Sequence, residues 1–123
     1  MFEKERVLEL LNRINDSICL IQSQRDRIKK PEDFISNQTG MFLLSGICMQ
    51  LIFIGESVKV IEKKTEGAYL IKYPMIPWIE IMGLRNLIAY QYHRIDEEEI
   101  FNVIYDDLDE LQNTVKIMIH DLG

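Results

Sequence analysis

The stretch that decides the fold is VLELLNRINDSICLIQSQRDRI, residues 7–28 of the 123-residue chain. Apolar residues recur here at alternating steps of four and three, and only Arg25 interrupts the series. The series consists of Val7, Leu11, Ile14, Ile18, Ile21 and Ile28. This spacing places apolar side chains along one face of an α-helix, so it predicts a long helix over about residues 3–29. Pro31 ends that helix, because proline disfavours helix at the residue before it.

Two further helical segments are expected in the middle of the chain. Pro31 begins a short turn of helix over residues 32–36, which is expected to carry Phe34 and Ile35 into the core. A second long helix follows over about residues 38–64. Its middle is apolar on nearly every side, which predicts that it is the most buried element of a bundle. Gly67 lies just beyond the expected end of this helix.

The second half of the chain predicts two more helices. Pro77-Trp78 suits the first turn of a helix that carries Ile79, Met82, Leu84, Leu87 and Ile88. Asp96 and Glu99 resemble a helix-starting cap. The last helix then shows one apolar face: Ile100, Ile104, Leu108, Leu111, Val115, Met118 and Leu122. Because no segment alternates as a strand does, the expected fold is an all-α, up-and-down bundle of four to five helices, forming one domain over residues 1–123.

Composition narrows the classes of function. The formal net charge is −6, so a general coat for DNA or RNA is disfavoured and any nucleic-acid contact must be local. The apolar run of residues 41–54 is shorter than a membrane span requires, and the N-terminus has no apolar signal core. A cytoplasmic protein without membrane contact is therefore expected. Cys19 and Cys48 lie far apart, so no metal and no cofactor is expected, and each cysteine is read as a small buried side chain.

One segment carries chemistry: Arg85-Asn86-Leu87-Ile88-Ala89-Tyr90-Gln91-Tyr92-His93. It follows an apolar helix with Gly55-Glu56 near its end and a Pro-x-x-Pro-Trp sequence at residues 74–78. This ordered series resembles the HEPN superfamily, and most closely the HepT-like toxins encoded beside small nucleotidyltransferases. Members of that family usually read Arg-Asn, three residues, His, any residue, Tyr. In this chain the histidine position holds Tyr90, and His93 stands three residues later.

The resemblance implies metal-independent RNA cleavage, in which the 2′-hydroxyl of the RNA attacks the adjacent phosphate. Arg85 would contact the phosphate, since the planar fork of arginine holds two phosphate oxygens, and Asn86 is a further catalytic candidate. Tyr90 is a poor base near neutral pH, although its phenol can donate a hydrogen bond or stack on a base. His93 is the candidate replacement. If the helix continues, Asn86, Tyr90 and His93 lie along one face. A surface histidine without catalytic role is the plainer interpretation of His93.

The resemblance also implies partners. Family members pair as homodimers whose two motifs line one cleft, and their nucleotidyltransferase antitoxins adenylylate the tyrosine that corresponds to Tyr92. Glu56 lies within an apolar helix, so a buried partner is expected for it, and Arg85 is the candidate. This pair would support the motif without doing chemistry. Alternatives are a catalytically impaired subunit that binds a nucleotidyltransferase, or a stand-alone helical protein that binds nucleotides.

Two charged runs allow two interpretations each. Eight acidic residues lie between positions 96 and 110. They form either a solvated helix face or a docking surface for a basic partner. The main basic cluster consists of Arg25, Arg27, Lys29 and Lys30. It either complements the dipole at the end of a helix or guides RNA toward a cleft.

Overall fold

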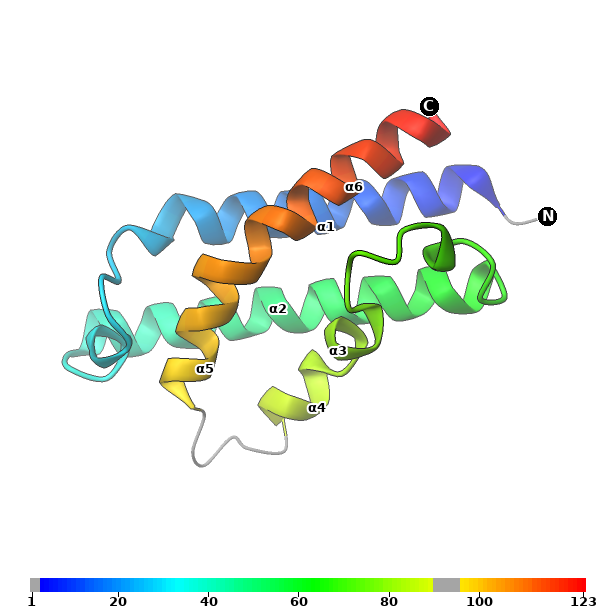
Figure 1. The fold of residues 1–123 in the computed structure, drawn as a ribbon. Coiled ribbons are helices and arrows are strands. Elements are labelled where there is room, and N and C mark those ends of the chain that lie inside the picture. The colour runs from blue at the N-terminus through cyan, green and yellow to red at the C-terminus, as the bar shows by residue number, and fades with distance from the viewer. Residues whose placement is uncertain (1–2, 90–95) are drawn as a thin grey trace.

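The computed structural model describes residues 3–89 and 96–123, and all regular structure in these ranges is helical (Figure 1). The elements, in chain order, are α1 (Lys4–Arg25), the 3₁₀ turn η1 (Pro31–Phe34), α2 (Gln38–Lys64), the 3₁₀ turn η2 (Leu70–Lys72), α3 (Trp78–Met82), α4 (Leu84–Ala89), α5 (Glu97–Asn102), the π-helical turn η3 (Val103–Asp107) and α6 (Leu108–Leu122). The expected all-α bundle is confirmed, because the buried apolar side chains of these helices form one contiguous cluster.

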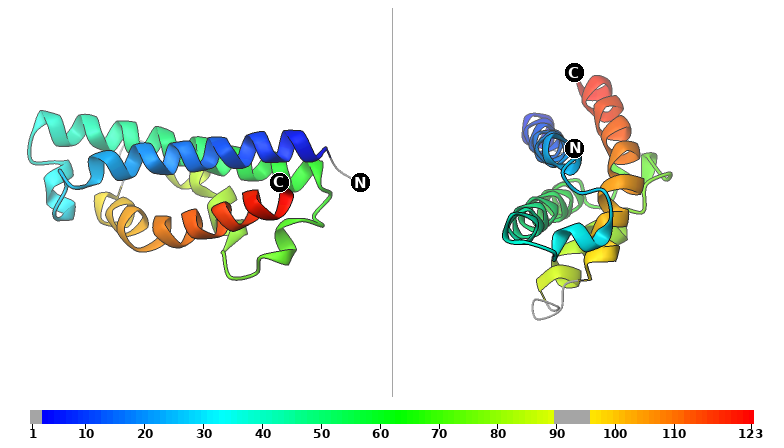
Figure 2. Two further views of the ribbon diagram at one scale, coloured as in Figure 1. Left: turned by 90° about the horizontal axis from the view of Figure 1, so that it is seen from above. Right: turned by 90° about the vertical axis from the view of Figure 1, so that its left-hand side faces the viewer.

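Helix α1 lies along α2 and α6, and it buries the predicted stripe against them (Figure 2). It ends at Arg25, about one turn before the predicted end. Ile28 nevertheless remains 1% exposed, because the turn after Arg25 folds it back onto the core. Phe34 is fully buried as expected. The expectation for Ile35 is wrong: its side chain is 53% exposed, since η1 ends at Phe34 and turns the next residue outward.

Helix α2 has the predicted bounds but buries only one face. Ile47, Leu51, Ile54, Val58 and Ile61 are buried at helical spacing. The opposite face carries exposed apolar side chains: Met41, Phe42, Met49 and Phe53. The helix is apolar on nearly every side, as its sequence indicates, but packing covers one side and leaves these apolar residues exposed. The helix is also longer than its most apolar run, so length and composition alone would suffice for a membrane span.

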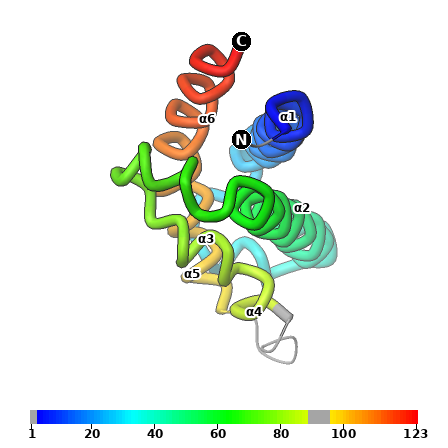
Figure 3. The backbone as a smooth tube through the Cα atoms, turned by 90° about the vertical axis from the view of Figure 1, so that its right-hand side faces the viewer, coloured from blue at the N-terminus to red at the C-terminus, as the bar shows by residue number. Residues whose placement is uncertain are grey.

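Helices α3 and α4 replace the single third helix that was expected, and both lie along α2 (Figure 3). Gly83 separates them. The close approach of α3 requires Gly55, because a Cβ atom there would lie 2.7 Å from the carbonyl oxygen of Ile81. Ile79, the next residue of α3 after Trp78, is 82% exposed. In so short a helix only Trp78 is fully turned inward, with its indole N–H donating to the carbonyl of Tyr73 at 2.8 Å.

The final rod consists of α5, η3 and α6 in unbroken succession. Asp96 caps it as predicted, because its carboxylate accepts from the backbone N–H groups of Glu98 and Glu99 at 3.0 and 3.2 Å. Ile100, Ile104 and Leu108 follow at steps of four, which would drift around an ideal α-helix. The wider π turn keeps all three buried on one face.

Candidate functional site

Helix α4 presents the Arg-Asn pair to solvent. Leu84 and Ile88 are buried against α2, with 9% and 5% of their surfaces exposed. Leu84 and Ile88 are four positions apart, about one helical turn, so both lie on the inner face of α4. The residues that directly follow Leu84 therefore point outward. Arg85 and Asn86 are accordingly exposed. The helix therefore holds both polar side chains on a rigid support, accessible to a large ligand.

Arg85 forms the ion pair that the sequence predicts with Glu56. The Nε atom of Arg85 lies 3.4 Å from Oε1 of Glu56. The expected burial of this pair is wrong, because the two side chains are 56% and 42% exposed. The physical reason is that Glu56 lies at the edge of the outward face of α2, three positions after the exposed Phe53. The side chain of Arg85 is more than half exposed, so its guanidinium group is accessible to an anion.

A surface hollow of about 420 Å³ adjoins Glu56. Helix α2 contributes Phe53, Glu56 and Ser57, and α1 contributes Arg13, Asp16 and Ser17. Arg13 also pairs with Glu9 at 3.1 Å and its side chain is 63% exposed. The sequence gives no signal for Arg13, because only the packing of α1 on α2 brings it to this place.

Three of the predicted site residues lie outside the described residues: Tyr90, Tyr92 and His93. The proposed roles of Tyr90 and His93 in catalysis and of Tyr92 in modification therefore stay predictions. Of the predicted set, the structure brings Arg85 and Glu56 together, and it places Asn86 beside them in sequence on the same exposed side of α4.

The basic cluster does not act as one surface. Arg25 donates two hydrogen bonds to the carboxylate of Asp109, at 3.0 and 3.2 Å, and a third to the carbonyl of Ile104 at 2.9 Å. The guanidinium carbon of Arg25 lies over the ring of Tyr105, 5.5 Å from the ring centroid. The Arg25 hydrogen bond is the main cause that lowers the pKa of Asp109. Arg25 thus ties α1 to the final rod and is not free to guide RNA.

The two cysteines differ from each other. Cys48 is buried as expected, and burial raises the pKa of its thiol to about 11, which keeps it in the unreactive thiol form. The expectation for Cys19 is wrong, because it is exposed. Cys19 accepts a hydrogen bond from the amide nitrogen of Gln112 at 3.4 Å. Among the described residues, no three His, Cys, Asp or Glu side chains gather in a group able to hold a metal ion.

A helical bundle with an outward Arg-Asn pair, supported by a Gly-Glu sequence on the neighbouring helix, matches the HEPN class that the motif indicates. The family model for "Ribonuclease HepT-like" matches residues 6–118. The chain belongs to the HepT-like ribonuclease family.

Curated relatives agree with this assignment. "Putative RNase MJ1380" of Methanocaldococcus jannaschii is 25% identical over 101 residues, which cover 80% of this chain and 89% of the relative. "Putative RNase MJ0125" of the same organism is 30% identical over 91 residues, covering 74% and 72%. "Putative RNase TTE0752" of Caldanaerobacter subterraneus subsp. tengcongensis is 29% identical over 85 residues, covering 69% and 70%. No solved structure matches the chain significantly.

Proposed function

We propose that this protein is a metal-independent endoribonuclease and the toxin component of a toxin–antitoxin pair. The observation that carries the proposal is the exposed Arg85-Asn86 pair, held on a helix whose opposite face is anchored in the core. The terminal N–H groups of Arg85 donate hydrogen bonds to oxygens of the scissile phosphate and stabilise the charge that develops there. Asn86 donates a further hydrogen bond from its amide.

The reaction needs proton transfer as well as charge stabilisation. The 2′-hydroxyl of the RNA attacks the adjacent phosphorus, and its proton goes to a base. The bond from phosphorus to the 5′-oxygen breaks, and that oxygen receives a proton, which leaves a cyclic phosphate and a free 5′-hydroxyl. An imidazole suits both transfers near neutral pH, so His93 is the proposed acid–base group. Tyr90, at the position of the family histidine, is proposed to stack on a base or donate to the substrate.

The proposal includes a homodimer. The exposed apolar stripe of α2 contains Phe42, Met49 and Phe53, and it runs directly into Glu56 and the Arg85 pair. A second apolar feature adjoins this stripe, a hollow of about 140 Å³ that includes Phe42 of α2 and Leu20 of α1. Solvent-exposed apolar area of this kind is typical of protein interfaces. Pairing of two copies through the stripe would bring two Arg85 side chains to one cleft. RNA bound in that cleft would then contact two guanidinium groups.

The second candidate function is a catalytically impaired subunit that partners a nucleotidyltransferase antitoxin. The observation that favours it is the tyrosine in place of the family histidine at position 90. In that case Tyr92 is the site of adenylylation. Added phosphate would place negative charge where RNA phosphate must bind, and the repulsion would exclude RNA.

The deciding experiment is cleavage of a single-stranded RNA in the presence of EDTA. The lead proposal predicts cleavage by the parent protein, loss of at least about 100-fold in Arg85→Ala, and a changed pH profile in His93→Ala. Arg6→Ala is the matched control, because Arg6 also forms an ion pair with a half-exposed glutamate, Glu9, at 2.8 Å. Cleavage that appears only in Tyr90→His would support the impaired subunit. Cleavage by Arg85→Ala at the parent rate would refute the proposed site.

A further inference from the structure

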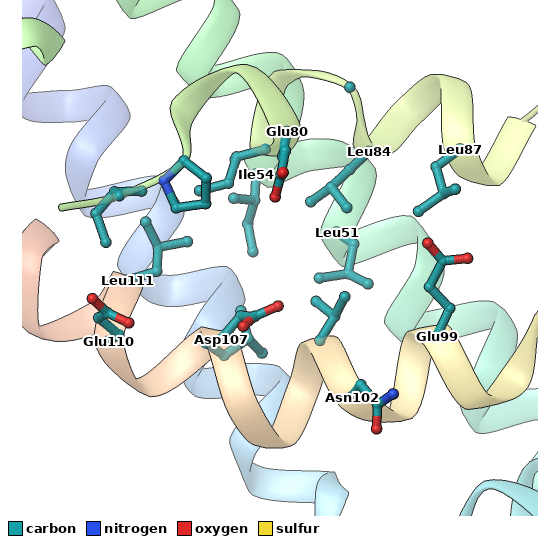
Figure 4. Close-up of a pocket in the computed structure, with 16 residues that line it drawn as sticks. Leu51, Ile54, Glu80, Leu84, Leu87, Glu99, Asn102, Asp107, Glu110 and Leu111 are labelled. Carbon is teal, nitrogen blue, oxygen red and sulfur yellow. The ribbon is translucent and has the colours of Figure 1, made fainter. Parts of the chain in front are cut away.

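A groove with an apolar floor separates α3 and α4 from the final rod (Figure 4). Its volume is about 570 Å³. Leu51 and Ile54 of α2 form the floor and are themselves buried, with at most 1% of their surfaces exposed. The apolar surface that stays accessible belongs to half-buried wall residues, Ile81 and Leu87 on one side and Val103 on the other. Apolar side chains of a partner could cover these walls and remove them from water.

Four carboxylates surround the apolar floor: Glu80, Glu99, Asp107 and Glu110. Figure 4 shows Glu80 on one wall, and Glu99 and Asp107 on the other, directed toward the space between the walls. No lysine, arginine or histidine of the described chain lines the groove, and none of these residues forms an ion pair with the four carboxylates. Partial burial and the charges of Asp106, Glu80 and Glu110 raise the pKa of Asp107. The carboxylates therefore oppose one another, and an incoming cation would relieve the repulsion.

We propose that this groove docks a basic, amphipathic α-helix of a protein partner. The half-buried apolar walls take leucine-like side chains, and the carboxylate rim pairs with flanking lysines or arginines. Glu99 and Glu110 lie eleven positions apart on one rod, which corresponds to about 16 Å, or about three helical turns of a docked segment. The docking does not depend on RNA cleavage, since Arg85 faces away from the groove while Leu84 and Leu87 face into it.

Other occupants fit less well. RNA is repelled by the acidic rim. A second copy of this chain offers its basic cluster, but Ile28, the apolar residue within that cluster, is 1% exposed and cannot reach the apolar walls. A small polycation would use the carboxylates and leave the apolar walls uncovered.

The probe is a synthetic, fluorescein-labelled helix of leucine and lysine, about three turns long, with the leucines on one face. We measure its binding to the full chain by fluorescence anisotropy. The rim variant carries Glu80→Gln, Asp107→Asn and Glu110→Gln. The matched variant carries Glu97→Gln, Glu98→Gln and Asp106→Asn, which change the net charge equally at residues that do not line the groove. A peptide of the same composition with scattered leucines is the probe control.

The proposal predicts that the rim variant weakens binding at least about tenfold and the matched variant less than about twofold. Val103→Phe adds bulk inside the groove and is expected to block the probe without removing charge. Circular dichroism and thermal melts establish that each variant is folded. RNA cleavage measured on the same samples separates failure of docking from failure of the nuclease assignment.

Three results would overturn the proposal. Equal weakening by the rim and matched variants would mean that net charge alone attracts the probe. Equal binding of the scattered-leucine peptide would mean that the apolar walls play no part. A change in sedimentation of the protein alone, seen in the rim variant only, would show that a second copy occupies the groove.

Discussion

Replacing Glu56 with glutamine tests how the ion pair controls Arg85. Two unit charges at the observed 3.4 Å interact by about 1 kcal/mol in water. Because both side chains are about half exposed, solvent screening and side-chain entropy reduce the net contribution to about 0.2–1 kcal/mol. We therefore expect Glu56→Gln to change the free energy of unfolding by less than about 1 kcal/mol. A double-mutant cycle with Arg85→Gln, measured by urea denaturation, gives the coupling free energy directly.

The same substitution is expected to separate RNA affinity from turnover. If Arg85 binds RNA phosphate as proposed, the carboxylate of Glu56 competes for the same guanidinium group, and its removal should strengthen RNA binding. A coupling of 0.2–1 kcal/mol corresponds to about 1.4- to 5-fold in Kd. Loss of the contact also frees the side chain of Arg85 to leave its catalytic orientation, so kcat should fall by about tenfold. The assay is cleavage under single-turnover conditions, with RNA affinity measured separately by filter binding.

Glu32→Gln is the control for net charge, because Glu32 is an exposed residue of η1, on a different element from the pair. The reasoning fails if Glu56→Gln leaves both kcat and Kd at parent values while Arg85→Ala is inactive. Glu56 would then be a surface charge without influence on the site. Equal changes in Glu32→Gln and Glu56→Gln would likewise assign the effect to net charge.

Three further predictions concern the scaffold. Arg25→Met should cost about 1–3 kcal/mol in urea denaturation at neutral pH, because it leaves the carbonyl of Ile104 without this donor and removes the pair with Asp109. The pKa of Asp109 is lower in the folded protein than in the unfolded chain, so the pair stabilises the fold at pH values above the unfolded pKa of Asp109. This stabilisation is lost as the pH falls through the folded pKa. A destabilisation by Arg25→Met that stays constant down to acid pH would contradict this account. Asp107→Asn should raise the midpoint of thermal unfolding at neutral pH, because the raised pKa of Asp107 means that its ionised form destabilises the fold. The gain should vanish in acid, where the parent carboxyl is protonated. A lower midpoint at neutral pH would contradict this prediction. Phe53→Asp should yield a monomer in sedimentation and reduce RNA cleavage, whereas a stable dimer would exclude the α2 stripe as the interface.

The alternatives for this family member differ in what they require of the motif. A nuclease needs Arg85 accessible, and the structure meets that condition. An impaired subunit needs only a docking surface for its partner, which the acidic groove would provide. Nuclease activity and partner docking are thus compatible in one molecule, since Leu84 and Leu87 of α4 line the groove and Arg85 and Asn86 do not.

Local pattern was enough for much of the fold. The apolar spacing of α1, the bounds of α2 and the cap at Asp96 follow from the sequence alone, because helix formation and capping depend on residues within a few positions of one another. The contact of Glu56 with Arg85 was predicted by chemistry, since an acidic residue in an apolar helix needs a cation, and the motif supplied one.

The tertiary structure alone decided which apolar faces are covered. Periodicity shows that α2 has apolar residues all around, but only packing shows that Phe53 faces solvent beside Glu56. Likewise, only packing places Arg25 against Asp109 and Arg13 beside the site. The reason is physical: helical spacing is set by the backbone, whereas burial depends on which distant segment arrives at each face.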